Sequence, residues 1–319
     1  MHPSVRAWAQ LVRVPNTLTA CADVLAGFSL SAGAWMQWNG AIPGLILMSL
    51  ASICLYWAGM ILNDVHDLDK DRAQRRTGPL VDGRILIGLA KRTGWGMLVG
   101  GVALIAAACL SIPQAGIVQW IVVGIGISLC LSILAYDSPW KGTAVGPFLM
   151  GICRALNMLL GVSFGACFIV PTGSDWIAIT IAVVGHCCYI VGITLAARRE
   201  GVLQQSSWRL GIAWSMSVLG VVGIACCSMW SVDRSLRLEP ASMYPLLIGL
   251  LMLPWLRRVY FSIAKPSVMT LVPAIKQAIL SILFLDAAIA MQFAGSIPGI
   301  LVCGLAIPTM ILGRTFRMT

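Results

Sequence analysis

The chain has 319 residues, of which 59% are hydrophobic and only 11% are charged. Soluble proteins carry about 25% charged residues, so this composition excludes an ordinary soluble domain and indicates a polytopic membrane protein. The net charge of +10 does not indicate nucleic-acid binding, because the basic residues are scattered over short polar segments at the ends of apolar runs. We therefore expect the lipid bilayer, and no nucleic acid, as a partner.

Continuous apolar runs of about 18 to 25 residues predict membrane-spanning helices, and they lack the alternation of a membrane β-barrel. The sequence therefore predicts an all-α membrane helix bundle, a single domain over residues 1–319, with nine or ten transmembrane helices. The count stays open because only a short Gly-Ser-Ile-Pro segment separates the last two runs. The predicted spans are 18–35, 41–62, 95–112, 116–135, 144–169, 175–196, 210–230, 243–262, 269–293 and 297–313.

The first apolar run follows a polar segment that contains Arg13, Pro15 and Asn16. Ala32 and Ala34 also match the cleavage site of a signal peptide. Asp23 interrupts the apolar run of such a peptide, however, and the later spans depend on this helix for their topology. We therefore expect the first run to remain in the bundle.

The longest polar segment, residues 63–92, follows the second run and holds half of the ten aspartates. On a helix, one arc of about 100° would contain four of its side chains. Carboxylates this close repel one another unless a cation lies among them, and an all-oxygen ligand set favours Mg²⁺ or Ca²⁺. The alternative is a solvated loop of mixed charge. The spacing favours a metal site, with Mg²⁺ as the expected ion and Asn63, Asp64, Asp67 and Asp71 as ligands.

Basic residues follow the acidic group within the same segment. Mg²⁺ commonly takes one or two protein carboxylates and completes its shell with water and substrate phosphate. Arginine and lysine next to such a site suit a diphosphate bridged by the metal. The basic residues of the segment beyond the acidic group are Arg72, Arg75, Arg76, Arg84, Lys91 and Arg92.

Several residues outside this segment are candidates because ionisable groups inside spans are costly and aromatic faces can stabilise a cation. Tyr136, beside Asp137 and Lys141, is the strongest aromatic candidate. Arg154 and Asn157 share a helix face and predict the lining of a polar cavity. For the remaining residues a structural role is an open alternative, with an interfacial belt for the aromatic ones; they are Asp23, Tyr56, Trp57, His186, Tyr189, Trp208, Lys276 and Asp286.

The basic residues also predict the orientation of the chain. If the N-terminus is cytoplasmic, 18 of the 22 lysines and arginines lie in inside segments. The positive-inside rule then places the acidic segment in the cytoplasm. We expect an integral protein of the cell (inner) membrane.

These motifs resemble the UbiA superfamily of intramembrane prenyltransferases. The matching features are Arg-x-Pro-Asn from Arg13, N-D-x-x-D-x-x-x-D from Asn63, the Gly83-Arg84 pair, and Tyr136 with Lys141. In that family, two aspartate-rich motifs hold Mg²⁺ around an isoprenyl diphosphate at the mouth of a helical cavity. The resemblance implies catalysis by Asp64, Asp67, Tyr136 and Arg154, and substrate binding by Asn63, Arg72, Arg76, Lys141, Asn157, Arg198 and Arg199.

The second motif departs from the family pattern. Its expected position reads Thr-Leu-Ala-Ala-Arg-Arg-Glu over residues 194–200, with Glu200 as the single acid. Arg198 and Arg199 stand where carboxylates were expected, and they could bind diphosphate in place of a second metal. The segments 153–157 and 189–200 resemble a divergent UbiA-like branch, the EboC type.

Two functions follow from this resemblance. The first is an enzyme that transfers an isoprenyl group from its diphosphate to a lipophilic or aromatic acceptor with Mg²⁺. The second is a non-catalytic UbiA-like carrier or assembly component that binds a prenyl or aromatic lipid, which the altered second motif motivates. Donor length and acceptor identity depend on cavity depth and shape, so the sequence predicts neither.

Overall fold

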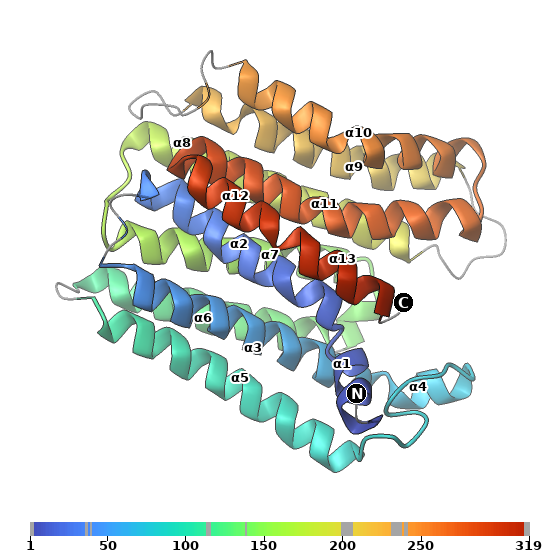
Figure 1. The fold of residues 1–319 in the computed structure, drawn as a ribbon. Helices are drawn as coiled ribbons and strands as arrows, with labels where there is room; N and C mark the ends of the chain where they lie inside the picture. The colour runs from blue at the N-terminus through green and yellow to red at the C-terminus, as the bar shows by residue number, and fades with distance from the viewer. Residues whose placement is uncertain are drawn as a thin grey trace.

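A computed structural model describes residues 3–35, 38, 40–112, 116–137, 139–198, 207–230, 238 and 242–315. Every regular element in these ranges is helical, which confirms the predicted all-α bundle (Figure 1). The α-helices are α1 (Pro3–Leu11), α2 (Val14–Ala32), α3 (Ile42–His66), α4 (Leu68–Ala73), α5 (Ile87–Leu110), α6 (Ile117–Tyr136), α7 (Gly146–Ala166), α8 (Gly173–Ala197), α9 (Ser207–Cys226), α10 (Met243–Ala264), α11 (Val268–Ala294), α12 (Ser296–Gly304) and α13 (Ala306–Thr315).

Nine helical segments in the described ranges are long and apolar enough to cross a membrane. They are α3, α5 to α8, α9 with the short 3-10 helix that follows it, α10, α11, and α12 together with α13. The chain is thus an integral polytopic membrane protein with nine candidate spans. The third predicted span begins earlier than expected, at Ile87 instead of residue 95. Its first turns carry Lys91 and Arg92, whose long side chains can reach the polar interface from a helix end.

The helix α2 covers the first predicted span but is not among the nine candidates. Its position explains its composition, because α2 lies in the middle of the bundle against α3, α7 and α11 (Figure 1). Polar side chains such as Thr19, Asp23 and Ser29 are buried there by protein instead of facing lipid. A helix enclosed in this way can carry polar groups that find hydrogen-bond partners on its neighbours.

The crossing of α2 and α7 depends on glycine. A Cβ atom on Gly161 would lie 2.1 Å from the carbonyl oxygen of Val24, and one on Gly27 would lie 2.0 Å from that of Met158. Both obstacles are backbone atoms, so a side chain at either position would force the helices apart. Small residues at membrane helix crossings allow this close approach.

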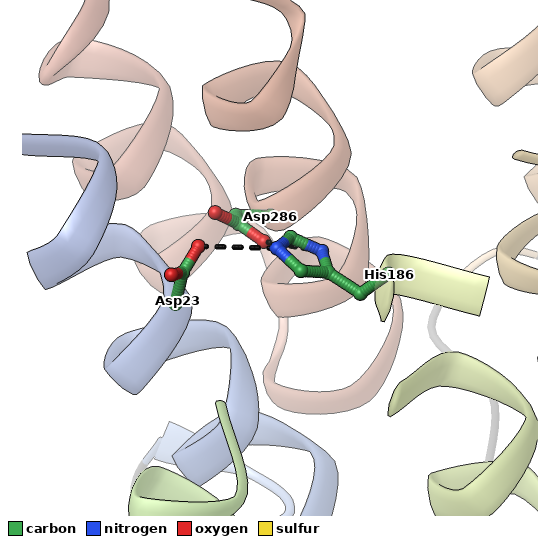
Figure 2. Close-up of side chains that lie close together, drawn as sticks. All are labelled: Asp23, His186 and Asp286. Carbon is green, nitrogen blue, oxygen red and sulfur yellow. Dashed lines mark ion pairs between the residues drawn. The ribbon is translucent and has the colours of Figure 1, made fainter. Parts of the chain in front are cut away.

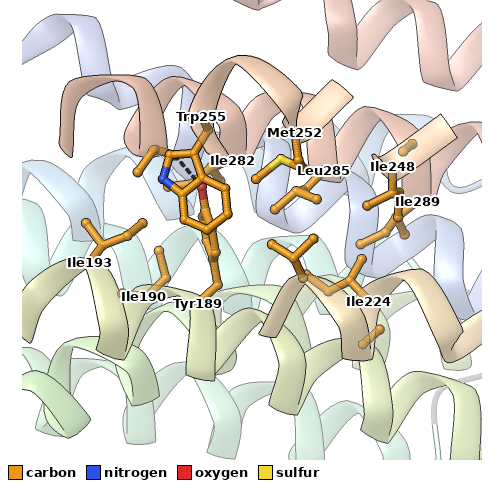
Figure 3. Close-up of a cluster of buried hydrophobic side chains, with 14 of the residues drawn as sticks. Tyr189, Ile190, Ile193, Ile224, Ile248, Met252, Trp255, Ile282, Leu285 and Ile289 are labelled. Carbon is orange, nitrogen blue, oxygen red and sulfur yellow. Dashed lines mark hydrogen bonds between the residues drawn. The ribbon is translucent and has the colours of Figure 1, made fainter. Parts of the chain in front are cut away.

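A large apolar cluster joins α8, α9, α10 and α11 (Figure 3). Tyr189 lies inside it, and its hydroxyl donates a hydrogen bond of 2.9 Å to the carbonyl of Ala278. Tyr189 is therefore a core residue in contact with Trp255, which does not suit the predicted cation-stabilising wall. Trp208, at the start of α9, is 64% exposed and matches the alternative of an interfacial aromatic.

The polar segment after α4 folds back onto the N-terminal helix. Leu80 and Ile85 are buried against α1 in a small apolar cluster that includes Ala7 and Leu11. Arg84 donates a hydrogen bond of 2.7 Å to Gln10 and one of 3.0 Å to Asp82. These contacts attach the segment to the end of the bundle where α3 ends (Figure 1).

Candidate functional site

The acidic motif lies at the junction of α3 and α4. The helix α3 ends at His66 and α4 begins at Leu68, with Asp67 between them. The backbone N–H of Asp67 donates to the carbonyl of Asn63 at 2.9 Å, and that of Asp71 donates to the carbonyl of Asp67 at 2.8 Å. These bonds have the i to i+4 spacing of an α-helix. The helical spacing that predicts a shared face is therefore kept across the junction.

Each of the three acidic side chains of the motif faces a basic one. Arg13 lies 3.6 Å from Asp64, and Arg76 lies 3.3 Å from Asp71. The third carboxylate, Asp67, forms an ion pair with the ammonium of Lys141. The three carboxylate side chains are between 22% and 26% exposed, so water can reach them. A ligand can therefore replace the basic partners of these carboxylates without any rearrangement of the buried core.

Two oxygen atoms of the motif converge on one cationic group. Lys141 lies on a short 3-10 helix, Pro139–Gly142, and its Nζ contacts both Asn63 Oδ1 and Asp67 Oδ2. An amide oxygen and a carboxylate oxygen that share an ammonium are arranged to hold a cation, and hard oxygen donors suit Mg²⁺. Asp64 and Asp71 have other partners, and over the described ranges the three carboxylates do not close into one ligand group. The donor set fits Mg²⁺, with Asn63 and Asp67 as its centre.

Two further predicted residues lie beside Lys141. Its Nζ is 5.7 Å from the ring centroid of Tyr136. The guanidinium of Arg198 donates to the carbonyl of Thr143 at 2.5 Å and to that of Lys141. Arg198 therefore connects the end of α8 to the turn that carries Lys141. The neighbouring Arg199 and Glu200 lie outside the described residues.

Asp137, which follows α6, was not predicted as a site residue. Its side chain is only 5% exposed, and its Oδ2 has no hydrogen-bond partner in the described structure. Burial raises the pKa of this carboxyl to about 7 against the effect of Lys141, and the carboxylates of Asp67 and Asp64 add to the rise. Its position between Tyr136 and Lys141 in the sequence was the signal that could have identified it.

Arg13 is the other residue of the site that was not predicted. It has left-handed backbone geometry, with φ of 51°, and it precedes the first turn of α2, where Pro15 lies. This turn carries the guanidinium to Asp64. The Arg-x-Pro-Asn pattern had pointed to this position without assigning it a role.

Arg154 and Asn157 do share a side of α7, as predicted, but they bind a different carboxylate. Arg154 donates to Asp23 at 2.6 Å and to Thr19 at 2.5 Å, and Asn157 donates to Asp23 at 3.0 Å. The structure thus assigns both to a buried network around α2, apart from the acidic motif. Arg72 is exposed on α4, and Lys276 is exposed on the third turn of α11.

The site and the helices together define a polytopic membrane bundle with a polar site at one end. No family model matches the chain. It is 28% identical over 176 residues to the digeranylgeranylglyceryl phosphate synthase of Sulfolobus acidocaldarius, which is 53% of this chain and 58% of the relative. It is 29% identical over 101 residues to the synthase of the same name from Saccharolobus solfataricus, 32% of this chain and 34% of the relative. The matches thus span about a third to somewhat over half of these relatives.

Solved structures resemble the chain over most of its length. A structure described as digeranylgeranylglyceryl phosphate synthase in membranes matches with a TM-score of 0.60 and 19% identity, over 92% of this chain and 99% of that one. A UbiA homologue from Archaeoglobus fulgidus, described as bound to GPP and Mg²⁺, matches with a TM-score of 0.56 and 17% identity, over 89% and 99%. The chain therefore has the fold of the UbiA superfamily prenyltransferases.

Proposed function

We propose that this chain, as a single membrane domain over residues 1–319, is a prenyltransferase of the UbiA type. It transfers an isoprenyl group from an isoprenyl diphosphate to a lipophilic or aromatic acceptor and uses Mg²⁺. The observation that carries the proposal is the convergence of Asn63 and Asp67 on one cationic group, the Lys141 ammonium. The fold shared with a homologue described as bound to GPP and Mg²⁺ supports it.

The roles follow from the positions of the side chains. Asn63 and Asp67 would hold Mg²⁺, with Asp64 and Asp71 completing the oxygen donors. When bound, the ion would stabilise the negative charge that grows on the departing diphosphate. Because Lys141 already contacts the central donors, its ammonium can move from Asp67 to a diphosphate oxygen once a metal takes its place.

Other residues bind and shield the substrate in this proposal. Arg72 and Arg76 are exposed next to the motif and can contact the diphosphate. The ring of Tyr136, close to Lys141, offers an electron-rich face to an allylic cation. Arg154 can act in catalysis, and Asn157 in substrate binding, only if the substrate reaches the buried network around Asp23.

The finer assignments are also proposals. We infer from the positive-inside rule that the protein lies in the cell (inner) membrane with its N-terminus and the acidic motif on the cytoplasmic side. The names of the matched relatives make a lipid phosphate such as a geranylgeranylglyceryl phosphate one acceptor to test among the lipophilic class. The EboC-type branch remains a proposal based on the segments 153–157 and 189–200.

One observation favours the second candidate, a carrier or assembly component that binds a prenyl or aromatic lipid without transfer. At the position of the expected second motif, Arg198 stands in place of a carboxylate. Its guanidinium donates hydrogen bonds to the carbonyls of Lys141 and Thr143. A site with one acidic motif could bind a diphosphate lipid through one metal ion without ionising it. Diphosphate release separates the two candidates.

The test uses the full chain in lipid nanodiscs. Geranyl, farnesyl and geranylgeranyl diphosphates are added with Mg²⁺ or with EDTA, and both binding and diphosphate release are measured. The informative variant is Asp64→Ala. The matched control is Asp69→Ala, because Asp69 is an exposed aspartate of α4 in the same polar segment but outside the predicted cluster.

Release that depends on Mg²⁺, that Asp64→Ala loses and that Asp69→Ala keeps would support the enzyme. Binding that depends on Mg²⁺ without release would favour the carrier. Neither binding nor release would contradict both candidates and leave only the shared fold.

A further inference from the structure

A second polar cluster lies in the middle of the bundle, and the proposed function does not use it. Asp23 on α2, His186 on α8 and Asp286 on α11 point toward one another (Figure 2). All three side chains are 0% exposed. Ionisable groups this deep in a membrane bundle are costly, so their meeting calls for a physical explanation.

The imidazole of His186 lies between the two carboxylates. Its Nε2 is 3.3 Å from Asp23 Oδ1, and its Nδ1 is 3.9 Å from Asp286 Oδ1. A neutral imidazole has one N–H and one bare nitrogen. With both carboxylates ionised, the bare nitrogen would face an anionic oxygen, which is repulsive. One additional proton would give each facing pair a donor.

The hydrogen bonds of the cluster also indicate one additional proton. The second oxygen of Asp23 is satisfied by Arg154 and Asn157. In the described structure, five polar atoms of the cluster have no hydrogen-bond partner: Asp23 Oδ1, both ring nitrogens of His186 and both oxygens of Asp286. Unpartnered buried polar atoms are costly, and these five face one another.

The charge balance of the cluster favours a proton over a divalent metal ion as its ligand. Two ionised carboxylates, a neutral imidazole and the Arg154 guanidinium sum to one negative charge. One proton brings the sum to zero, whereas a divalent metal ion would bring it to one positive charge. A metal would also need an entry path to side chains that are fully buried. Nearby neutral groups do not change this sum; they are Cys21 on α2, Tyr56 on α3 and Tyr244 on α10.

We propose that Asp23, His186 and Asp286 form a proton-binding site at the centre of the bundle. On folding, the site takes one proton from water and holds it between the imidazole of His186 and the carboxyl of Asp286. Either group can carry it, so the proton belongs to the pair. The bound proton leaves Asp23 ionised as the partner of Arg154. This proposal does not depend on prenyl transfer.

The first test measures the proton through stability. The free energy of unfolding of the full chain is obtained by reversible SDS titration in mixed micelles between pH 7 and 8. Both proteins compared carry Asp137→Asn, which removes the other buried carboxyl that titrates near this range. With the site present, the unfolding constant should rise about tenfold more per pH unit than in the Asp286→Asn variant.

Asp286→Asn is informative because it removes one negative charge, after which Asp23 and Arg154 balance without a proton. The other titrating groups, the cysteines included, are common to both proteins and cancel in the difference. Equal slopes in the two proteins would overturn the proposal.

A second test observes the proton directly by spectroscopy in the protein with its cluster intact. The chain has three histidines, so ¹⁵N-histidine labelling gives few signals, and His2→Gln and His66→Gln assign them. At pH 8, we expect either a doubly protonated His186 ring or, by infrared spectroscopy, a protonated buried carboxyl that Asp286→Asn removes. A neutral ring with no protonated carboxyl would contradict the site. So would a stoichiometric metal in elemental analysis that His186→Gln releases.

Discussion

Two groups of aspartates in this chain are both paired with basic residues, but their surroundings differ. Asp64, Asp67 and Asp71 lie at the end of the bundle and are about a quarter exposed. Asp23 and Asp286 lie in its centre and are fully buried. Exposed ion pairs contribute little to stability, and water can replace a lost partner. A buried pair that loses one member leaves an uncompensated charge. The first group can therefore exchange its partners for ligands, whereas the second maintains the fold.

The largest expected effect is on activity at the exposed group. Asp67→Ala should lower the rate of Mg²⁺-dependent diphosphate release by about 1,000-fold or more, because the loss of metal stabilisation is worth several kcal/mol. The free energy of unfolding should change by less than about 1 kcal/mol. Activity close to that of the wild type would remove the metal site from the proposal.

The reverse pattern is expected at the buried group. Asp23→Ala should lower the free energy of unfolding by about 3 to 5 kcal/mol, because Arg154 loses its 2.6 Å partner in a dry environment. The SDS titration that measures this should also show that Asp23→Leu combined with Arg154→Met recovers part of the loss, since a buried pair can often be replaced by apolar groups. A loss below about 1 kcal/mol would mean that Arg154 is hydrated.

A smaller effect is expected at Lys141, whose ammonium contacts the proposed metal ligands Asn63 and Asp67. Lys141→Gln should tighten Mg²⁺ binding without diphosphate by about 3- to 10-fold, because the ammonium no longer competes for Asp67. The same variant should weaken diphosphate binding. Isothermal titration calorimetry measures both, with Lys70→Gln as a control from the same segment. An unchanged Mg²⁺ affinity would show that the ion binds elsewhere.

The effect of pH should identify Asp137 at the edge of the exposed group. Its pKa is raised to about 7 in the fold, whereas an unfolded aspartate titrates near about 3.9. The folded state therefore binds the extra proton between these values, and stability from this group falls as pH rises from about 4 through 7. Asp137→Asn should raise the melting temperature at pH 8 by about 5 °C or more relative to wild type, because about three pKa units correspond to about 4 kcal/mol. The difference should vanish near pH 4, as thermal scans in detergent can check.

The smallest effect is expected at the most exposed pair. Arg76 is 64% exposed beside Asp71, so Arg76→Ala should change stability by less than about 0.5 kcal/mol. A measurable rise in the Michaelis constant for the diphosphate would still be consistent with its proposed binding role. A larger loss of stability would show that the exposed group also maintains the fold.

The spans could be predicted from the sequence because a bilayer requires each helix to satisfy its own backbone and to be about 20 apolar residues long. Both conditions are local. The boundary at Ile87 was placed too late because Lys91 and Arg92 resemble loop residues in a hydropathy pattern. The shared face of the acidic motif could also be predicted, since Asn63, Asp67 and Asp71 follow one another at the i to i+4 spacing of a helix.

The partners of these residues were decided by tertiary structure. Arg13 reaches Asp64, Lys141 reaches Asp67, and Arg198 reaches the turn of Lys141 only because distant helix ends meet at one end of the bundle. In the centre, Asp23, His186 and Asp286 were recognisable as ionisable residues inside spans, but nothing in their pattern predicted that they would meet. Their spacing along the chain carries no period, and which helix faces which depends on packing, such as the glycine-mediated crossing of α2 and α7. Residue chemistry is local information, whereas the charge balance of a buried site depends on all the helices that enclose it.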